Sequence, residues 1–114
     1  AEAVRHAEVY RSSFAISVCP SENVESPTIV GAQAANELLN IIGIKASFVL
    51  TEYNDKIYIS SRSIDEINVQ IIMERMGGGG HANIAAAQFE NAKAEDIKKE
   101  LVGLLNEMYK EGDI

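Results

Sequence analysis

The chain has 114 residues, of which 46% are hydrophobic, and a formal net charge of −7. This length allows one domain with a modest core, and no apolar run approaches the roughly 18 residues that a membrane span requires. The negative charge argues against nonspecific binding of long nucleic acid, although a small anionic ligand could still bind at a local positive site.

Residues 1–11 are predicted to form a helix with a thin apolar stripe, typical of a linker that leans on a neighbouring domain. No signal peptide is visible. The chain does not begin with Met and its first residues already have the pattern of a helix interior, so we expect it to be a piece of something longer. Residues 14–19, FAISVC, predict a strand that Pro20 ends, followed by the polar loop SENVES. Cys19 is the single cysteine, so it cannot form an internal disulfide; we interpret it as a buried thiol in a reducing, cytoplasmic setting.

A helix is predicted to begin at Pro27, with Ser26 as its N-cap, because Pro at the first helical position loses no hydrogen bond. Gly43 is expected to end it. Its alanines allow close approach to a sheet. The apolar residues at helical spacing, which we expect to face the core, are Ile29, Ala32, Ala35, Leu38, Leu39 and Ile42.

Residues 46–53 and 56–62 predict a hairpin, since both residues of the turn, Asn54 and Asp55, tolerate a positive φ. The expected core face of this hairpin carries Phe48, Leu50, Ile57 and Ile59. The other face carries Val49, Tyr53, Tyr58, Ser60 and Arg62, with polar groups near the strand end at 60–62.

Asn68 is predicted to cap a two-turn helix that leads directly into Gly77, and residues 84–90 regain β character. A final helix is expected after Glu95 and Asp96, with the apolar stripe Ile97, Leu101, Leu104, Leu105 and Met108. The alternation of strands and helices predicts a single α/β domain with a small mixed β-sheet and flanking helices.

The segment MGGGGHANIAAAQ, residues 76–88, places four glycines before His81. Bare backbone amides can converge on an anion, the histidine can donate to a phosphate or stack on a base, and the following alanines keep the region open. The alternative is a flexible or tightly packed turn with an exposed histidine. The segment is neither a Walker A loop nor a dinucleotide fingerprint, because no lysine with Ser or Thr follows and a helix precedes it.

Arg62, flanked by Ser61 and Ser63 at a strand end, is a candidate phosphate ligand; the alternative is a solvated surface arginine. His6 is assigned no role. Neither a His/Asp cluster with metal-ligand spacing nor a Ser-His-acid set stands out. The sequence therefore predicts a phosphate site without the chemical groups for hydrolysis.

The segments SSRS (60–63), INVQIIMERMGGGGH (67–81) and ANIAAAQ (82–88) resemble the DHH-associated domain of type one (DHHA1), the C-terminal half of DHH-family phosphoesterases. The resemblance spans roughly residues 12–110 and is nearest to the Gram-positive branch that cleaves cyclic di-AMP. It implies that residues 1–11 end an interdomain linker helix and that residues 12–114 form a substrate-binding domain.

The resemblance also implies a division of labour. A preceding DHH domain, which this chain lacks, would hold two manganese ions and perform the hydrolysis, so no catalytic or metal-binding residue is expected here. The parent would be anchored in the membrane with this domain in the cytoplasm. Its partners could include a second copy of the same chain in a homodimer. The substrate, a cyclic dinucleotide or a short oligonucleotide, would be contacted by Arg62, Gly77, Gly78, Gly79, Gly80 and His81, with Ser61, Asn68 and Asn83 as secondary candidates.

The sequence is also compatible with two other functions. One is the equivalent domain of an oligoribonuclease or single-strand exonuclease of the same superfamily, which acts on short linear nucleic acid. The other is a stand-alone nucleotide-binding module without a catalytic partner.

Overall fold

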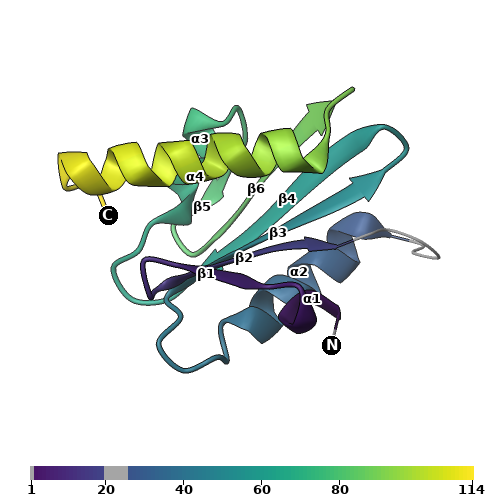
Figure 1. Ribbon diagram of the computed structural model, residues 1–114. Coiled ribbons are helices and arrows are strands. Elements are labelled where there is room, and N and C mark those ends of the chain that lie inside the picture. Colours follow the sequence, from purple (N-terminus) through teal and green to yellow (C-terminus); the bar gives the residue numbers. More distant parts are fainter. Residues whose placement is uncertain (1, 20–25) are drawn as a thin grey trace.

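The computed structural model describes residues 2–19 and 26–114, which form a six-stranded mixed sheet with helices on both faces (Figure 1). The predicted fold class is confirmed. The elements in chain order are α1 (Glu2–Arg5), β1 (Glu8–Tyr10), β2 (Phe14–Cys19), α2 (Pro27–Leu38), β3 (Ala46–Tyr53), β4 (Lys56–Ser63), α3 (Val69–Arg75), β5 (Gly79–His81), β6 (Ile84–Glu90) and α4 (Ala94–Glu111).

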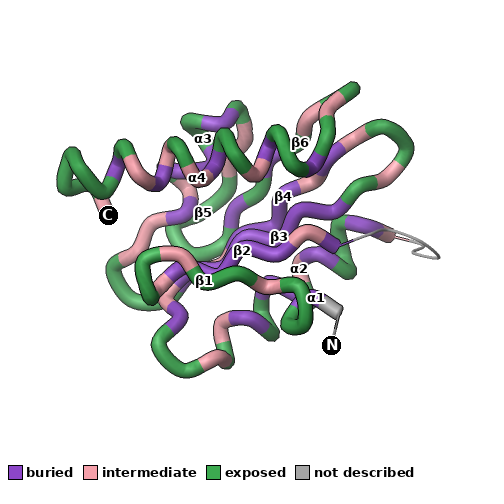
Figure 2. Tube along the Cα trace, viewed as in Figure 1, coloured by how far each residue is buried: buried purple, intermediate pink, exposed green. Residues whose placement is uncertain are grey.

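The strand order is β1-β2-β3-β4-β6-β5. The pair β2 and β3 is parallel and is connected through α2, whereas all other neighbours are antiparallel. Helices α3 and α4 cover one face of the sheet, and α1 and α2 cover the other (Figure 1). The residues of β2, β3 and β4, most of which are buried, lie between these two layers (Figure 2).

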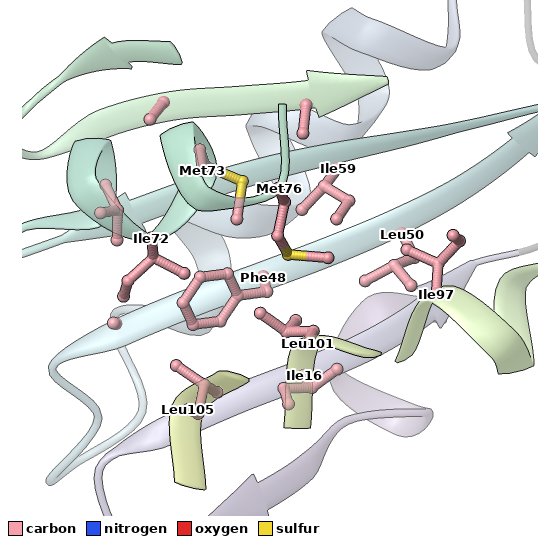
Figure 3. Packing of buried hydrophobic residues seen from close by; sticks show 14 of the residues in the cluster. Ile16, Phe48, Leu50, Ile59, Ile72, Met73, Met76, Ile97, Leu101 and Leu105 are labelled. Carbon is pink, nitrogen blue, oxygen red and sulfur yellow. The ribbon is translucent and has the colours of Figure 1, made fainter. Parts of the chain in front are cut away.

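The larger core lies between the sheet and the α3–α4 layer. Phe48, Leu50 and Ile59 from the sheet meet Ile72, Met73 and Met76 near α3 and Ile97, Leu101 and Leu105 from α4 (Figure 3). The smaller core, on the α2 face, consists mainly of small and medium side chains, among them Ala15, Ala34, Ala35, Leu38 and Val49.

Most of the predicted elements are confirmed. The strand at 14–19, the hairpin, the strand at 84–90 and the final helix are present, and the turn residues Asn54 and Asp55 have φ values of 49° and 63°. The two faces of the hairpin are assigned as expected, since Phe48, Leu50, Ile57 and Ile59 all lie in the larger core. Cys19 is buried, as predicted.

The prediction of one helix over residues 1–11 is wrong. Helix α1 ends at Arg5, and β1 then pairs antiparallel with β2 through the register Glu8 with Ile16 and Tyr10 with Phe14. The connection is a tight turn in which Arg11 and Ser12 take φ values of 50° and 66°. Pairing with the edge of the sheet satisfies more hydrogen-bonding groups of this backbone than a short isolated helix would.

The predicted core face of α2 is also wrong in part. The helix ends at Leu38 rather than near Gly43, Ile29 is 59% exposed, and Ile42 is fully exposed at 100%. Small residues face the sheet instead, and a Cβ at Gly31 would lie only 2.7 Å from Ser60 Oγ. Ser26 is the N-cap residue, although its side chain makes no capping hydrogen bond. The predicted stop at Pro20 and the loop at 21–25 lie outside the described residues.

Gly103 lies on the exposed side of α4, where an added Cβ would meet no atom of the described chain within 4 Å. Gly103→Ala is therefore expected to raise the free energy of unfolding by roughly 0.5–1 kcal/mol, because alanine restricts the unfolded chain and favours the helix. Urea denaturation measures this change. Gly112→Ala is the control with the opposite sign, because Gly112 caps the same helix at φ 80°. A lowered midpoint for Gly103→Ala would contradict this account.

Candidate functional site

A hollow of about 550 Å³ lies on the α2 face of the sheet. Helix α2 packs on β3 and β4, and the hollow extends from Thr28 and Ala32 of α2 across β4 and β6 to the glycine run. Its volume is within the range typical of small-molecule sites. The residues predicted to contact substrate that line it are Arg62, Gly77, Gly78, Gly79, Gly80 and His81.

Strand register explains why Arg62 and His81 lie at one end of the hollow. Arg62 pairs with Ile84, and Ile84 pairs with His81, so the three side chains point to the same face of adjacent strands. Two strand spacings separate Arg62 from His81, which places their Cα atoms roughly 10 Å apart. The residue between them, Ile84, is 54% exposed and gives the site an apolar floor at this end.

Arg62 supplies the positive charge of the site. It is half-buried, and its Nη1 donates to the carbonyl oxygen of Ser61 at 2.8 Å. Partial burial lowers the pKa of the Arg62 guanidinium, which still stays protonated at neutral pH. Among residues 2–19 and 26–114, no carboxylate forms an ion pair with it. Most of its donors therefore remain available to an anion.

The glycine run begins as a helix cap. Gly77 has φ 88°, its N–H donates to Glu74 O at 3.1 Å, and the N–H of Gly78 donates to Met73 O at 2.8 Å. These two bonds form a Schellman motif at the end of α3. The expectation that the amides of the whole run are free for an anion is therefore wrong for Gly77 and Gly78.

The later glycines have two kinds of surroundings, because two of them pack tightly against β6 and one faces the hollow. A Cβ at Gly78 would lie 2.1 Å from Ala86 O, and one at Gly80, where φ is 145°, would lie 2.5 Å from Ile84 O. Tight packing thus explains these two positions. At Gly79 a Cβ would meet no described atom within 4 Å. Because Gly79 pairs with Ala86 in the row that lines the hollow, its missing side chain leaves room for a ligand.

The secondary candidates lie outside the lining of the hollow. Ser61 points to the opposite face of β4, because side chains alternate along a strand, and its buried hydroxyl donates to Ala85 O at 2.8 Å. Asn68 caps α3, as predicted, by accepting from Ile71 N at 3.2 Å. The Asn83 amide donates to Ser63 Oγ at 2.9 Å, which in turn donates to Ile67 O at 2.6 Å. This network holds the β5–β6 turn beside the end of β4.

Sequence reasoning did not assign several residues of the site. These residues are Thr28, Tyr58, Ile84 and Gln88, and they line the hollow together with Ala86, one of the alanines expected to keep the region open. Strand alternation places Tyr58 on the same face as Arg62, but no ligand role follows from that placement alone. Ile84, Ala86 and Gln88 alternate along β6, so they would have been found had the pairing of β6 with β4 been predicted.

In the described part of the chain, no group of three or more His, Cys, Asp or Glu side chains is placed to hold a metal ion. His6 is exposed, and His81, which lines the hollow, is likewise exposed. No helix among the described residues is long and apolar enough to span a membrane.

Replacing the cap residue tests whether Asn68 has a structural or a binding role. Asn68→Ala is expected to lower the free energy of unfolding by about 1 kcal/mol, because Ile71 N loses its capping acceptor. Ligand affinity should stay unchanged at temperatures where the variant is folded. Chemical denaturation and nucleotide titration measure the two effects, with Asn36→Ala, exposed in α2, as the control. Wild-type stability combined with weakened binding would contradict a pure capping role.

The chain matches the family model of the DHHA1 domain over residues 12–111. It is 40% identical, over 94% of its length, to the cyclic-di-AMP phosphodiesterase PdeA of Listeria monocytogenes. It is 41% identical, over 93% of its length, to a membrane protein-large ribosomal subunit bL9 fusion protein of Aster yellows witches'-broom phytoplasma. The chain spans 16% and 12% of the lengths of these two relatives.

A solved structure with a similar fold is an exopolyphosphatase-related protein from Bacteroides fragilis. The TM-score is 0.76 at 20% sequence identity, and the match covers 95% of this chain and 34% of that chain. At this level of identity the likeness concerns the fold alone.

Proposed function

The chain belongs to the DHHA1 domain family, and on this premise we propose that it is the substrate-binding domain of a phosphodiesterase that opens cyclic di-AMP to the linear dinucleotide. The relation to a cyclic-di-AMP phosphodiesterase over 94% of the chain supports this substrate. The remainder of such a parent protein, including its catalytic domain, would lie outside this chain.

The observation that carries the proposal is the row Arg62, Ile84, His81 at one end of the hollow. A guanidinium without an acidic partner in the described chain favours an anion, and its fork of donors matches two phosphate oxygens. The imidazole of His81 would donate to a phosphate or stack on a base across the exposed Ile84. Gly79 would let the ligand approach the backbone.

In this proposal the domain binds and orients the phosphate, and a DHH domain supplies hydrolysis through manganese ions that its own residues hold. Orientation alone can contribute substantially to catalysis, because a phosphate that is held in place is already positioned for nucleophilic attack. The parent is proposed to be membrane-anchored with this domain in the cytoplasm. The phytoplasma relative, a membrane protein fusion, supports the membrane anchor.

A comparison of substrates on the parent catalytic unit tests the proposal. Cyclic di-AMP and a short linear RNA are titrated separately against the wild-type protein and against His81→Ala. We expect tighter binding of cyclic di-AMP and a loss of that affinity in the variant. Preference for the linear RNA would instead favour an oligoribonuclease, and binding of both ligands unaffected by His81→Ala would contradict the assigned site.

The 114-residue chain alone is expected to release no linear dinucleotide from cyclic di-AMP, with or without added manganese, because the proposal assigns the metal ligands to the DHH domain. Chromatography of the reaction mixture measures the product. Turnover that a chelator abolishes and manganese restores in this chain would contradict the assignment.

A further inference from the structure

The end of the hollow opposite Arg62 is formed by Tyr58 and Gln88, which are direct partners in the β4–β6 register. Tyr58 lies four residues before Arg62 on β4, so both side chains face the hollow, and the two Cα atoms are roughly 13 Å apart. Between these ends the floor consists of Ser60 and Ala86, which pair with each other and have small side chains.

Tyr58 and Gln88 both keep their polar side-chain groups available for a ligand. In the part of the chain that the structure describes, no hydrogen bond involves the Tyr58 hydroxyl or the Gln88 amide. Tyr58 is half-buried and Gln88 is exposed. An aromatic ring and a free amide, side by side, therefore border the hollow.

The charges around this end do not suit a second phosphate. The next cross-strand pair beyond Tyr58 and Gln88 is Lys56 with Glu90, and their Nζ and Oε1 atoms are 3.7 Å apart. The nearest cation on this row is thus already paired with a carboxylate. The free cationic group of the hollow is at the Arg62 end, so the Tyr58 end is electrically neutral.

Neutral aromatic and amide groups are suited to a nucleobase. A base stacks on an aromatic side chain, and the two fused rings of a purine offer that side chain a larger face than a pyrimidine does. A glutamine amide, with its N–H donors beside a carbonyl acceptor, can in addition bind the N6–H donor and the N7 acceptor of adenine. We propose that Tyr58 and Gln88 form a base subsite that prefers adenine, with the nucleotide lying along β4 and its phosphate at Arg62. This inference rests on the proposed nucleotide-binding function.

The test is an NMR titration of the 114-residue chain with three probes: linear 5′-phosphorylated diadenylate, the corresponding diuridylate, and ribose 5-phosphate, which has no base. Tyr58→Leu is expected to weaken both dinucleotides at least fivefold, and Tyr58→Phe, which keeps the ring, should bind like the wild type. The wild type should bind diadenylate more tightly than diuridylate, and Gln88→Leu should weaken diadenylate binding at least fivefold. Neither leucine variant should change ribose 5-phosphate binding.

The outcomes separate this inference from the function on which it rests. If Arg62→Ala weakens all three probes but Tyr58→Leu and Gln88→Leu bind the dinucleotides like the wild type, the base subsite is overturned and the phosphate site stands. If Arg62→Ala has no effect on any probe, the proposed function fails. Because Gln88 is exposed, its variant tests the contact to adenine even if Tyr58→Leu does not fold.

Discussion

Arg62→Ala in the parent enzyme is expected to reduce kcat/KM for cyclic di-AMP by roughly 10- to 150-fold, a loss of about 1.5–3 kcal/mol. The guanidinium at the end of the hollow has no carboxylate partner in the described chain and makes one hydrogen bond to its own backbone neighbour. Its removal therefore takes away a charge-assisted contact to phosphate and leaves no buried acid unpaired, so folding should change little.

Two variants make this experiment specific. Arg62→Lys keeps the charge but not the fork of donors, and should recover only part of the loss. Arg75→Ala removes an arginine of α3 that pairs with Glu111 and Asp113 outside the hollow, and should leave kcat/KM unchanged. Wild-type kinetics of Arg62→Ala together with a lowered melting temperature would show that Arg62 has a structural role.

Gly78→Ala is expected to lower the free energy of unfolding by roughly 1–3 kcal/mol. The new Cβ would lie 2.1 Å from Ala86 O and 2.7 Å from the Cα of Ala87, both backbone atoms of β6, so β5 would have to move away from β6. Urea denaturation of the 114-residue chain measures the loss.

Gly79→Ala is the matched control, because it makes the same chemical change one residue later, where a Cβ meets no described atom within 4 Å. We expect near-wild-type stability for this variant and weaker nucleotide binding, since its methyl group would enter the hollow. Equal destabilisation by both substitutions would contradict the packing assigned to Gly78. Unchanged nucleotide affinity of Gly79→Ala would show that the ligand does not approach this stretch of backbone.

The local elements of the fold could be predicted because their signals lie within a few residues. The turn at Asn54 and Asp55, the cap at Asn68 and the stripe of α4 each depend on neighbours in the sequence. The face of α2 could not be predicted, because its small residues face the sheet. Close packing at Gly31 matters there more than burial of Ile29.

The candidate site could be predicted only where its signals are local in the sequence. The glycine run and Arg62 stand out in the sequence, but their proximity depends on β6 pairing with both β4 and β5. That long-range pairing also determines that Tyr58 and Gln88 meet, and no local pattern indicates it. Of the two interpretations of the glycines, tight packing is confirmed at Gly78 and Gly80, whereas anion binding stays a prediction that the open position at Gly79 allows.

The central claim is that a phosphate binds between Arg62 and the segment from Gly79 to His81. It is tested most directly by titrating the ¹⁵N-labelled chain with linear 5′-phosphorylated diadenylate and following the backbone amides together with the Arg62 side-chain Nε–H. We predict saturable shifts at Arg62, Gly79, Gly80 and His81, with α4 unaffected. Shifts confined to other surfaces, with these four residues unchanged at saturation, would contradict the account.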